Sequence, residues 1–497
     1  MGKVSNKKTI VSGLFWSYGE RLAAQGISML VSIILARLLT PNEYGIISVV
    51  MIFITLCNAL VTGGFGNALI QKKDSDELDF STMLICSIGL SVALYIVLFL
   101  SAPWISRFYD MELLKPVIRV LGIRVMITGI NTIQHAKVQK TMEFKRFFVA
   151  TLYGTIISAI VGIGLAYAGF GVWALVAQYL TNSIIDTVAL FFMNKWIPSM
   201  CFSLQRAKGL MSYGWKVLAT TIVYTVEGNI RSLIIGKVFG PADLAFYDQG
   251  KKFPNLLVSN INSSISKVML PALSENQDDK QRLQQMCRRS IRTGIFLLCP
   301  LLIGLISVAD TFVSVILTEK WIPCIPYLQI LTLVFLVRPL TTTCQQAIMA
   351  TGRSDITLKI EIVLNVLALG LLGISVFWFR SILWIAWSNV ITEYVSLCLF
   401  MYSVKKIIGY SIRDQLADML PGLLLSGMMG ILVVSVKVLP VSGVSLLVFQ
   451  ILSGAMSYVI GAFLCKMDAF RYLLKMLYER KHLRVLAWMI HHMDKEE

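Results

Sequence analysis

The chain has 497 residues, of which 56% are hydrophobic and only 15% are charged. Soluble domains carry about 25% charged residues, so this composition excludes an ordinary soluble protein and favours one that lies in a lipid bilayer. The net charge of +17 does not require a nucleic-acid partner, because basic loops on the cytoplasmic side of a membrane protein explain such an excess.

Apolar stretches long enough to cross a membrane recur along the whole chain. A bilayer core of roughly 30 Å requires ~20 apolar residues in a helix, and the backbone polar groups in lipid must be bonded within that helix. We therefore predict an all-α membrane protein of about fourteen transmembrane helices. The predicted spans are 10–38, 44–69, 80–103, 115–136, 147–168, 172–193, 209–238, 243–271, 290–317, 326–350, 356–378, 382–403, 420–438 and 443–465.

The distribution of Lys and Arg between loops predicts the orientation. With the N-terminus in the cytoplasm, 29 of the 45 basic residues fall on the cytoplasmic side and 8 fall on the other side. This asymmetry and the even number of spans predict that both termini are cytoplasmic.

Short identities at a nearly constant offset predict an internal repeat. They pair 17–19 with 212–214, 40–44 with 240–244, and 134–136 with 345–347. Parallel repeats of this kind are a transporter plan with a substrate cavity between the halves. We predict a six-helix N-terminal lobe, a six-helix C-terminal lobe, two extra helices and a basic amphipathic cytoplasmic tail, at 1–194, 195–408, 409–466 and 467–497.

The tail combines apolar residues at helical spacing with several Lys and Arg residues. One interpretation is a helix that lies on the anionic inner leaflet. The alternative is a stop-transfer tail whose basic side chains reach the membrane surface.

Charged residues inside the predicted spans are the main candidates for a site, because such residues are rare in lipid and usually face a cavity or a partner. Most of them lie in the spans 10–38, 209–238 and 243–271. The candidates for substrate binding are Arg21, Lys216, Arg231, Lys251, Lys252, Arg338 and Arg124. The candidates for charge balance or ion coupling are Glu20, Glu227 and Asp248, and Asp186 is a further acidic residue within a span.

This excess of basic residues predicts a water-filled chamber for an anionic substrate, since Arg and Lys bind phosphate and diphosphate groups. Glu227 and Arg231 are four residues apart and are expected to pair on one helix face. Pro254 and Pro339 are expected to interrupt their helices beside the buried charge. The same charges could instead tie helices together or extend to the membrane surface.

The sequence contains no pattern of a catalytic, metal or nucleotide site. The four histidines form no cluster, the nine cysteines form no CxxC pair, and no Walker A motif is present. We therefore expect no cofactor, no metal and no enzymatic activity.

Four segments carry a family resemblance, namely 36–45, 68–74, 233–237 and 268–274. With these segments the chain resembles the oligosaccharide flippases, the Wzx-like and teichuronic-acid-exporter-like branch of the multidrug/oligosaccharidyl-lipid/polysaccharide exporter (MOP) superfamily. The resemblance implies a two-lobed exporter that works by alternating access. It also implies a cavity lined by helices 1, 2, 7 and 8, and an undecaprenyl-diphosphate-linked oligosaccharide as substrate.

We therefore expect a flippase that moves a lipid-linked oligosaccharide from the inner to the outer leaflet of a bacterial cytoplasmic membrane, for lipopolysaccharide or capsule synthesis. Membrane lipids are the expected partners, and H+ or Na+ is the candidate coupling ion. No nucleic-acid partner is expected, and the chain is expected to be a monomer. The alternatives are a cation-coupled multidrug exporter, a membrane enzyme such as a glycan polymerase or ligase, and a non-transporting scaffold. The enzyme would need a larger outer loop than the chain is predicted to have.

Overall fold

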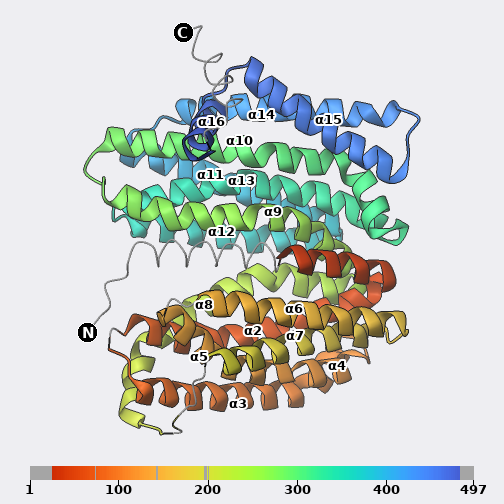
Figure 1. The fold of residues 1–497 in the computed structure, drawn as a ribbon, viewed down its shortest axis with the longest axis vertical. Helices are drawn as coiled ribbons and strands as arrows, with labels where there is room; N and C mark the ends of the chain where they lie inside the picture. Colours follow the sequence, from red (N-terminus) through yellow and green to blue (C-terminus); the bar gives the residue numbers. More distant parts are fainter. Residues whose placement is uncertain (1–24, 73, 142–143, 195–198, 200, 482–497) are drawn as a thin grey trace. The chain divides into compact units, whose positions relative to one another are not determined.

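A computed structural model describes residues 25–72, 74–141, 144–194, 199 and 201–481. Every regular element in these residues is a helix, which confirms the all-α fold class (Figure 1). The chain forms two compact units, Met1–Ala245 (unit 1) and Phe246–Glu497 (unit 2). The lobe boundaries expected from the repeat stay a prediction.

Unit 1 begins, in its described part, with the apolar helix Gln25–Leu38. The helices that follow are α2 (Pro41–Gln71), α3 (Glu77–Tyr109), α4 (Leu114–Leu121), α5 (Ile123–Thr141), α6 (Phe144–Tyr167), α7 (Val172–Asn194) and α8 (Leu204–Val238).

Unit 2 contains α9 (Pro241–Ser274), which starts in the last residues of unit 1, and α10 (Lys280–Phe312), extended by the π-helical turn η1 (Val313–Leu317). The short helix η2 (Glu319–Cys324) leads into α11. The remaining elements are α11 (Ile325–Ala350), α12 (Ser354–Ile374), η3 (Ser375–Phe379), α13 (Ile382–Ile408), α14 (Ile412–Ser435), η4 (Val436–Val438), α15 (Gly443–Leu464) and α16 (Asp468–Lys481).

Each predicted span falls on a helix wherever its residues are described. Eleven helical segments of the described chain are long and apolar enough to cross a membrane. The other three predicted spans correspond to Gln25–Leu38 and to α8 and α9, which are 35 and 34 residues long and carry charged residues. The chain is therefore a multi-pass membrane protein, and the total of about fourteen spans stays a prediction.

Helices at equivalent positions of the predicted repeat have equivalent neighbours. In unit 1, α6 packs on α7, α5 packs on α7, and α3 packs on α5. In unit 2, α12 packs on α13, α11 packs on α13, and α10 packs on α11. The two units thus reuse one packing plan, in agreement with the repeat predicted from short sequence identities.

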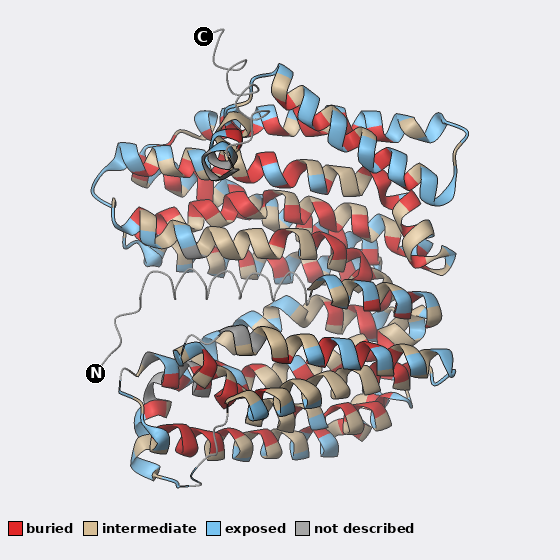
Figure 2. Ribbon diagram, viewed as in Figure 1, coloured by how far each residue is buried: buried red, intermediate tan, exposed pale blue. Residues whose placement is uncertain are grey.

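Buried and exposed residues alternate along the helices (Figure 2), and many of the exposed residues are large and apolar. The side chains of Phe377 and Trp378, for example, are 83% and 84% exposed. Large exposed apolar residues on a soluble protein would favour aggregation, whereas on a membrane helix they face lipid.

The turn before α2, which is predicted to be outer, is fixed by a reciprocal cap. The Thr40 amide donates to Glu43 Oε2 at 2.7 Å, and the Glu43 amide donates to Thr40 Oγ1 at 3.4 Å. Such a capping box satisfies amides that a helix start leaves free. The repeat-equivalent turn at Pro241 lies against Gly45, where a Cβ would come within 1.7 Å of the Pro241 carbonyl oxygen. Only glycine fits at that contact.

Loops predicted to share one side of the membrane contact each other within each unit. Lys237 Nζ lies 2.9 Å from Asp110 Oδ2, and Lys437 Nζ lies 2.7 Å from Asp310 Oδ2, at ends predicted to be outer. At an end predicted to be cytoplasmic, Lys72 Nζ lies 2.6 Å from Asp79 Oδ2. These contacts agree with the alternation of the spans, and which side is cytoplasmic stays a prediction.

The expected helix interruptions at Pro254 and Pro339 are wrong, because α9 and α11 run through both prolines. In α11 the Thr343 hydroxyl donates to the Pro339 carbonyl at 2.8 Å, and the Thr341 hydroxyl donates to the Arg338 carbonyl at 2.9 Å. Membrane helices tolerate proline where neighbouring helices and local polar groups satisfy the freed backbone groups, so that the helix continues in lipid.

The described part of the tail forms α16, which packs on α10. Arg292 Nη1 lies 2.5 Å from Asp468 Oδ2, and the Arg289 guanidinium lies 3.6 Å from the centre of the Tyr472 ring. The first half of the tail is therefore attached to unit 2, and the part after residue 481 lies outside the described residues.

At the predicted cytoplasmic end of unit 1, Arg206 at the start of α8 is paired with both Asp76 and Asp79 at the start of α3. Asp79 is fully buried and also pairs with Lys72. The hydrogen bond from Arg206 is the largest influence on Asp76, and it lowers the pKa of that carboxyl to about 2. The same contact raises the pKa of the Arg206 guanidinium.

Replacing Arg206 by Ala should lower the thermal unfolding midpoint, because the buried Asp79 carboxylate loses one of its charged partners. The change should also remove an acid-sensitive contribution to stability. The pKa of Asp76 is about 2 in the folded chain and 3.8 ordinarily, so this contribution is complete above about pH 4 and disappears as the pH falls through about 2.

The measurement is the thermal unfolding midpoint of the purified protein in detergent at several pH values. Lys237→Ala is the control, because it breaks an exposed ion pair, and such pairs contribute little. Equal midpoints for Arg206→Ala and the wild type would contradict the assignment.

Candidate functional site

The predicted site residues fall in both units, and some lie outside the described part of the chain. Arg21 and Glu20 belong to the undescribed N-terminal residues, and the side chain of Lys216 on α8 is not described either. The remaining candidates lie on α5, α8, α9 and α11. Their assembly into one chamber stays a prediction.

Arg231 and Glu227 lie one turn apart on α8, and both are half-buried. The expected ion pair between them is wrong, because no contact joins the two described side chains. A pair at this spacing is worth only ~0.2–0.5 kcal/mol, too little to fix two flexible side chains. The Arg231 Nε is buried and has no hydrogen-bond partner in the described chain. An unpaired buried guanidinium nitrogen is available to an anionic ligand.

Arg338 and Arg124 have protein partners. Arg338 Nε lies 3.8 Å from Glu393 Oε2, and its guanidinium lies 4.9 Å from the centre of the Phe335 ring. Arg124 Nε donates to Ser183 Oγ at 2.9 Å and so links α5 to α7. These contacts favour a structural contribution from both arginines over direct substrate binding.

Asp248, Lys251 and Lys252 are half-buried on α9. Asp248 is close enough to Lys252 for an electrostatic interaction. One carboxylate cannot fully neutralise two neighbouring ammonium groups, so this part of α9 has a positive excess.

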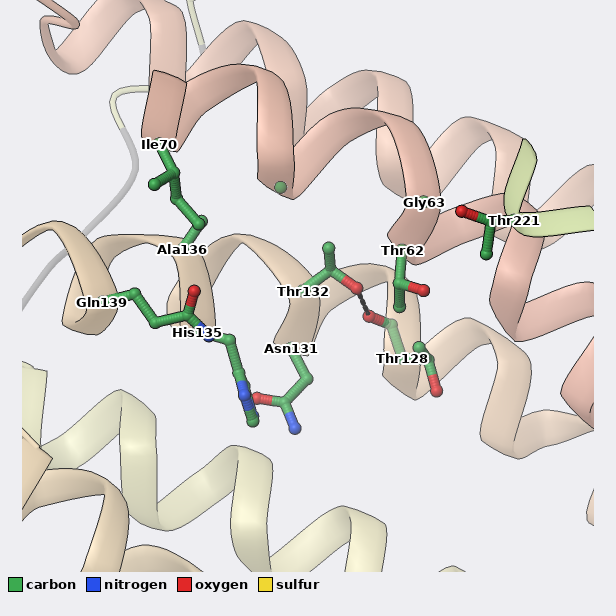
Figure 3. Close-up of a pocket in the computed structure, with 11 residues that line it drawn as sticks. Thr62, Gly63, Ile70, Thr128, Asn131, Thr132, His135, Ala136, Gln139 and Thr221 are labelled. Carbon is green, nitrogen blue, oxygen red and sulfur yellow. Dashed lines mark hydrogen bonds between the residues drawn. The ribbon is translucent and has the colours of Figure 1, made fainter. Parts of the chain in front are cut away.

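Unit 1 contains a pocket of about 420 Å³ between α2, α5 and α8 (Figure 3). Most of its described lining side chains are small, hydroxyl-bearing or amide-bearing, and no described lining residue is Lys, Arg, Asp or Glu. The lining residues are Thr62, Gly63, Gly66, Ile70, Thr128, Asn131, Thr132, His135, Ala136, Gln139 and Thr221.

Several of these hydroxyls already donate to their own helix. The Thr132 hydroxyl donates to the Thr128 carbonyl at 2.7 Å, and the Thr221 hydroxyl donates to the Val217 carbonyl at 2.8 Å. Each hydroxyl oxygen keeps a lone pair for a further bond. The Asn131 Oδ1 is buried and has no hydrogen-bond partner in the described chain. The wall therefore offers hydrogen bonds to a neutral polar ligand such as a sugar.

Two glycines of α2 bring the neighbouring helices close to the pocket. A Cβ at Gly63 would lie 3.2 Å from Thr221 Oγ1 of α8, and a Cβ at Gly66 would lie 3.3 Å from Thr132 Cγ2 of α5. Larger residues at these positions would push α8 or α5 away.

The charge-based analysis of the sequence did not identify this pocket. Its signal is a different one: Thr128, Asn131, Thr132, His135 and Gln139 recur at three- to four-residue spacing on an otherwise apolar span. That spacing places them on one helix face, and a polar face inside a membrane span indicates a cavity or a polar neighbour.

Behind this face lies Asp186 on α7, whose side chain is 14% exposed. Asn131 Nδ2 donates to Asp186 Oδ2 at 2.8 Å, and His135 Nε2 lies 3.5 Å from the same oxygen. Thr151 Oγ1 of α6 donates to Asp186 Oδ1 at 3.4 Å. Insertion scales assign an Asp at the centre of a membrane helix a cost of ~2.5–3.5 kcal/mol, and these polar contacts offset part of it.

Comparison with known proteins gives a family. The family model described as "Polysaccharide biosynthesis protein" matches residues 34–326. The teichuronic acid biosynthesis protein TuaB of Bacillus subtilis (strain 168) is 25% identical over 439 residues, which cover 86% of this chain and 89% of TuaB. The lipopolysaccharide biosynthesis protein WzxC of Escherichia coli (strain K12) is 24% identical over 365 residues, covering 72% and 73% of the two chains.

Among solved structures, the chain is similar to the lipid II flippase MurJ in an inward closed conformation. The TM-score is 0.72 at 15% sequence identity, and the match covers 92% of this chain and 99% of MurJ. At this identity the match establishes the fold, which agrees with the expected MOP-type architecture.

The pocket can be tested for water access by cysteine labelling. In a variant whose nine cysteines are replaced by alanine, Thr128→Cys and Thr221→Cys should react with a water-soluble maleimide, because both positions line an open polar space. Thr343→Cys is the control, since that residue is 0% exposed in unit 2. Labelling of all three positions at the same rate would contradict an open pocket.

Proposed function

The chain belongs to the family of polysaccharide biosynthesis proteins, and from this premise we propose that it is a flippase for a lipid-linked oligosaccharide. The observation that carries the proposal is the uncharged, hydrogen-bonding pocket of about 420 Å³ inside a membrane-embedded helical unit. Sugars are neutral and rich in hydroxyl groups, and such a lining can replace the water that they lose on entering a membrane protein.

The oligosaccharide is proposed to be linked to undecaprenyl diphosphate. Arg231, Lys251 and Lys252 are the basic residues best suited to the diphosphate, because Arg and Lys bind phosphate oxygens. The Arg231 Nε without a protein partner supports this assignment. The polyprenyl chain would remain in the bilayer while the polar end crosses.

Transport is proposed to follow alternating access between the repeated halves, from the inner to the outer leaflet of a bacterial cytoplasmic membrane. The basic ends of both units support a cytoplasmic position for both termini. The chain is proposed to work as a monomer and to supply a cell-surface polysaccharide such as lipopolysaccharide or capsule.

A cation-coupled multidrug exporter is the second candidate. The lining of the unit 1 pocket argues against it, because a site for cationic drugs is expected to present carboxylates, and no described residue of the lining is Asp or Glu. Susceptibility of a deletion strain to cationic drugs distinguishes the two functions. Sensitisation with normal surface glycan would support the drug exporter.

Arg231→Ala and Lys251→Ala should each reduce glycan export about tenfold or more, because each removes a charged hydrogen bond to the substrate. Surface polysaccharide of a complemented deletion strain is the measurement, with protein levels checked by immunoblot. Lys237→Ala, which removes a basic residue from the same helix as Arg231, should leave export unchanged. Full export in the double variant would disprove the diphosphate assignment.

Removing two hydroxyls from the pocket, in the variant Thr62→Val/Thr128→Val, should reduce export several-fold, since each lost hydrogen bond to a sugar is worth about 1 kcal/mol. The matched control is Thr55→Val, because Thr55 lies on the same helix, is exposed and donates to a backbone carbonyl as Thr62 does, but is not among the described residues that line the pocket. Equal export by the pocket variant and the control would argue against sugar binding at this site.

A further inference from the structure

Asp186 is largely buried and, unlike the more deeply buried Asp79 and Asp418, has no lysine or arginine partner among the described residues. Asp79 pairs with Lys72 and Arg206. In unit 2, Asp418 pairs with Arg288 at 2.7 Å and with Arg292 at 2.6 Å. The partners of Asp186 are instead an amide, a hydroxyl and the imidazole of His135.

The charged groups on the helices packed against α7 have other partners or lie elsewhere along their helices. Arg124 of α5 reaches α7 at Ser183, one turn before Asp186. On α2, Glu43 is bonded to Thr40, and on α4 the Arg119 guanidinium lies 4.2 Å from the Phe99 ring centre. Arg146 of α6 lies five residues before Thr151. In the described chain none of these groups forms an ion pair with Asp186, so no described lysine or arginine neutralises it.

Asp186 also lies deep in the membrane. It is eight residues from the end of α7 at Asn194, which corresponds to roughly 12 Å along the helix axis. A carboxylate at this depth needs a cation or a proton to be neutral. With a neutral imidazole the Asp186–His135 pair carries one negative charge, and a single proton shared by the two groups removes it.

His135 connects this pair to the pocket. Its side chain lines the pocket and is 31% exposed, and its Nε2 lies 3.5 Å from Asp186 Oδ2. Asn131 also lines the pocket (Figure 3) and donates to Asp186. A ligand that contacts either side chain therefore alters the surroundings of the proton. Because the two binding equilibria are linked, binding of the proton must then change the affinity for that ligand by the same factor.

We propose that Asp186 and His135 form a proton-binding site whose occupancy is linked to the unit 1 pocket, and that this site couples glycan movement to the proton gradient. The inference rests on the proposed function for its substrate. It assigns the coupling ion to a proton and the coupling carboxylate to α7. Glu20, Glu227 and Asp248 are then residues of charge balance.

The proton site can be tested without the glycan. Dicyclohexylcarbodiimide enters membranes and adds to protonated carboxyl groups, so membranes containing the chain are treated between about pH 5 and pH 8 and the peptides are analysed by mass spectrometry. We expect an adduct at Asp186 that decreases as the pH rises. In His135→Gln this pH profile should shift, because the second proton acceptor is gone, and the exposed Asp110 should give no adduct in any variant.

Coupling is tested by surface-glycan export in cells, with and without a protonophore. The wild type should lose export when the gradient collapses, Asp186→Asn should lose export in both conditions, and Asp186→Glu should recover part of it. An unlabelled Asp186, or export by Asp186→Asn that matches the wild type in both conditions, would overturn the proposal. Failure of the wild-type chain to restore export would instead contradict the flippase function, whereas the carbodiimide result concerns the proton site alone.

Discussion

The need to satisfy every polar group that is buried in lipid governs this structure. Backbone groups are satisfied by helix formation throughout the described chain. Charged side chains are satisfied by partners within the same unit, as Arg206 is by Asp76 and Asp79, and as Asp418 is by Arg288, Arg292 and the Tyr410 hydroxyl. Side chains that depart from this rule are the ones to which function is best assigned.

Two kinds of departure occur in unit 1. In the part of the chain that the structure describes, Arg231 retains a buried nitrogen without a hydrogen-bond partner, and Asp186 has polar partners but no lysine or arginine partner. The first suits an anionic group supplied by a substrate, and the second suits a proton. Between α2, α5 and α8 lies a pocket whose hydroxyl and amide lining suits neutral sugar rings. A diphosphate-linked glycan contains both kinds of chemistry, which is why one substrate can account for these features.

The ion pairs at the ends of the helices hold each unit together. Arg206 attaches the start of α8 to the start of α3, and Lys237 attaches the other end of α8 to Asp110. In unit 2, Arg292 joins α10 to both α14 and α16. Because alternating access requires rigid bodies that move relative to one another, pairs of this kind keep each helix in register during such a movement.

The sequence by itself determined the membrane class, the position of each helix and the repeated plan, because hydropathy and loop charge act along the chain and need no knowledge of packing. It also placed Arg231 and Asp186 among the intramembrane charges. Only the tertiary structure decided which charges are neutralised: it paired Arg338 with Glu393, did not pair Glu227 with Arg231, and brought His135 of α5 to Asp186 of α7. Such pairings depend on how helices distant in sequence pack, which helical spacing within a single span does not specify.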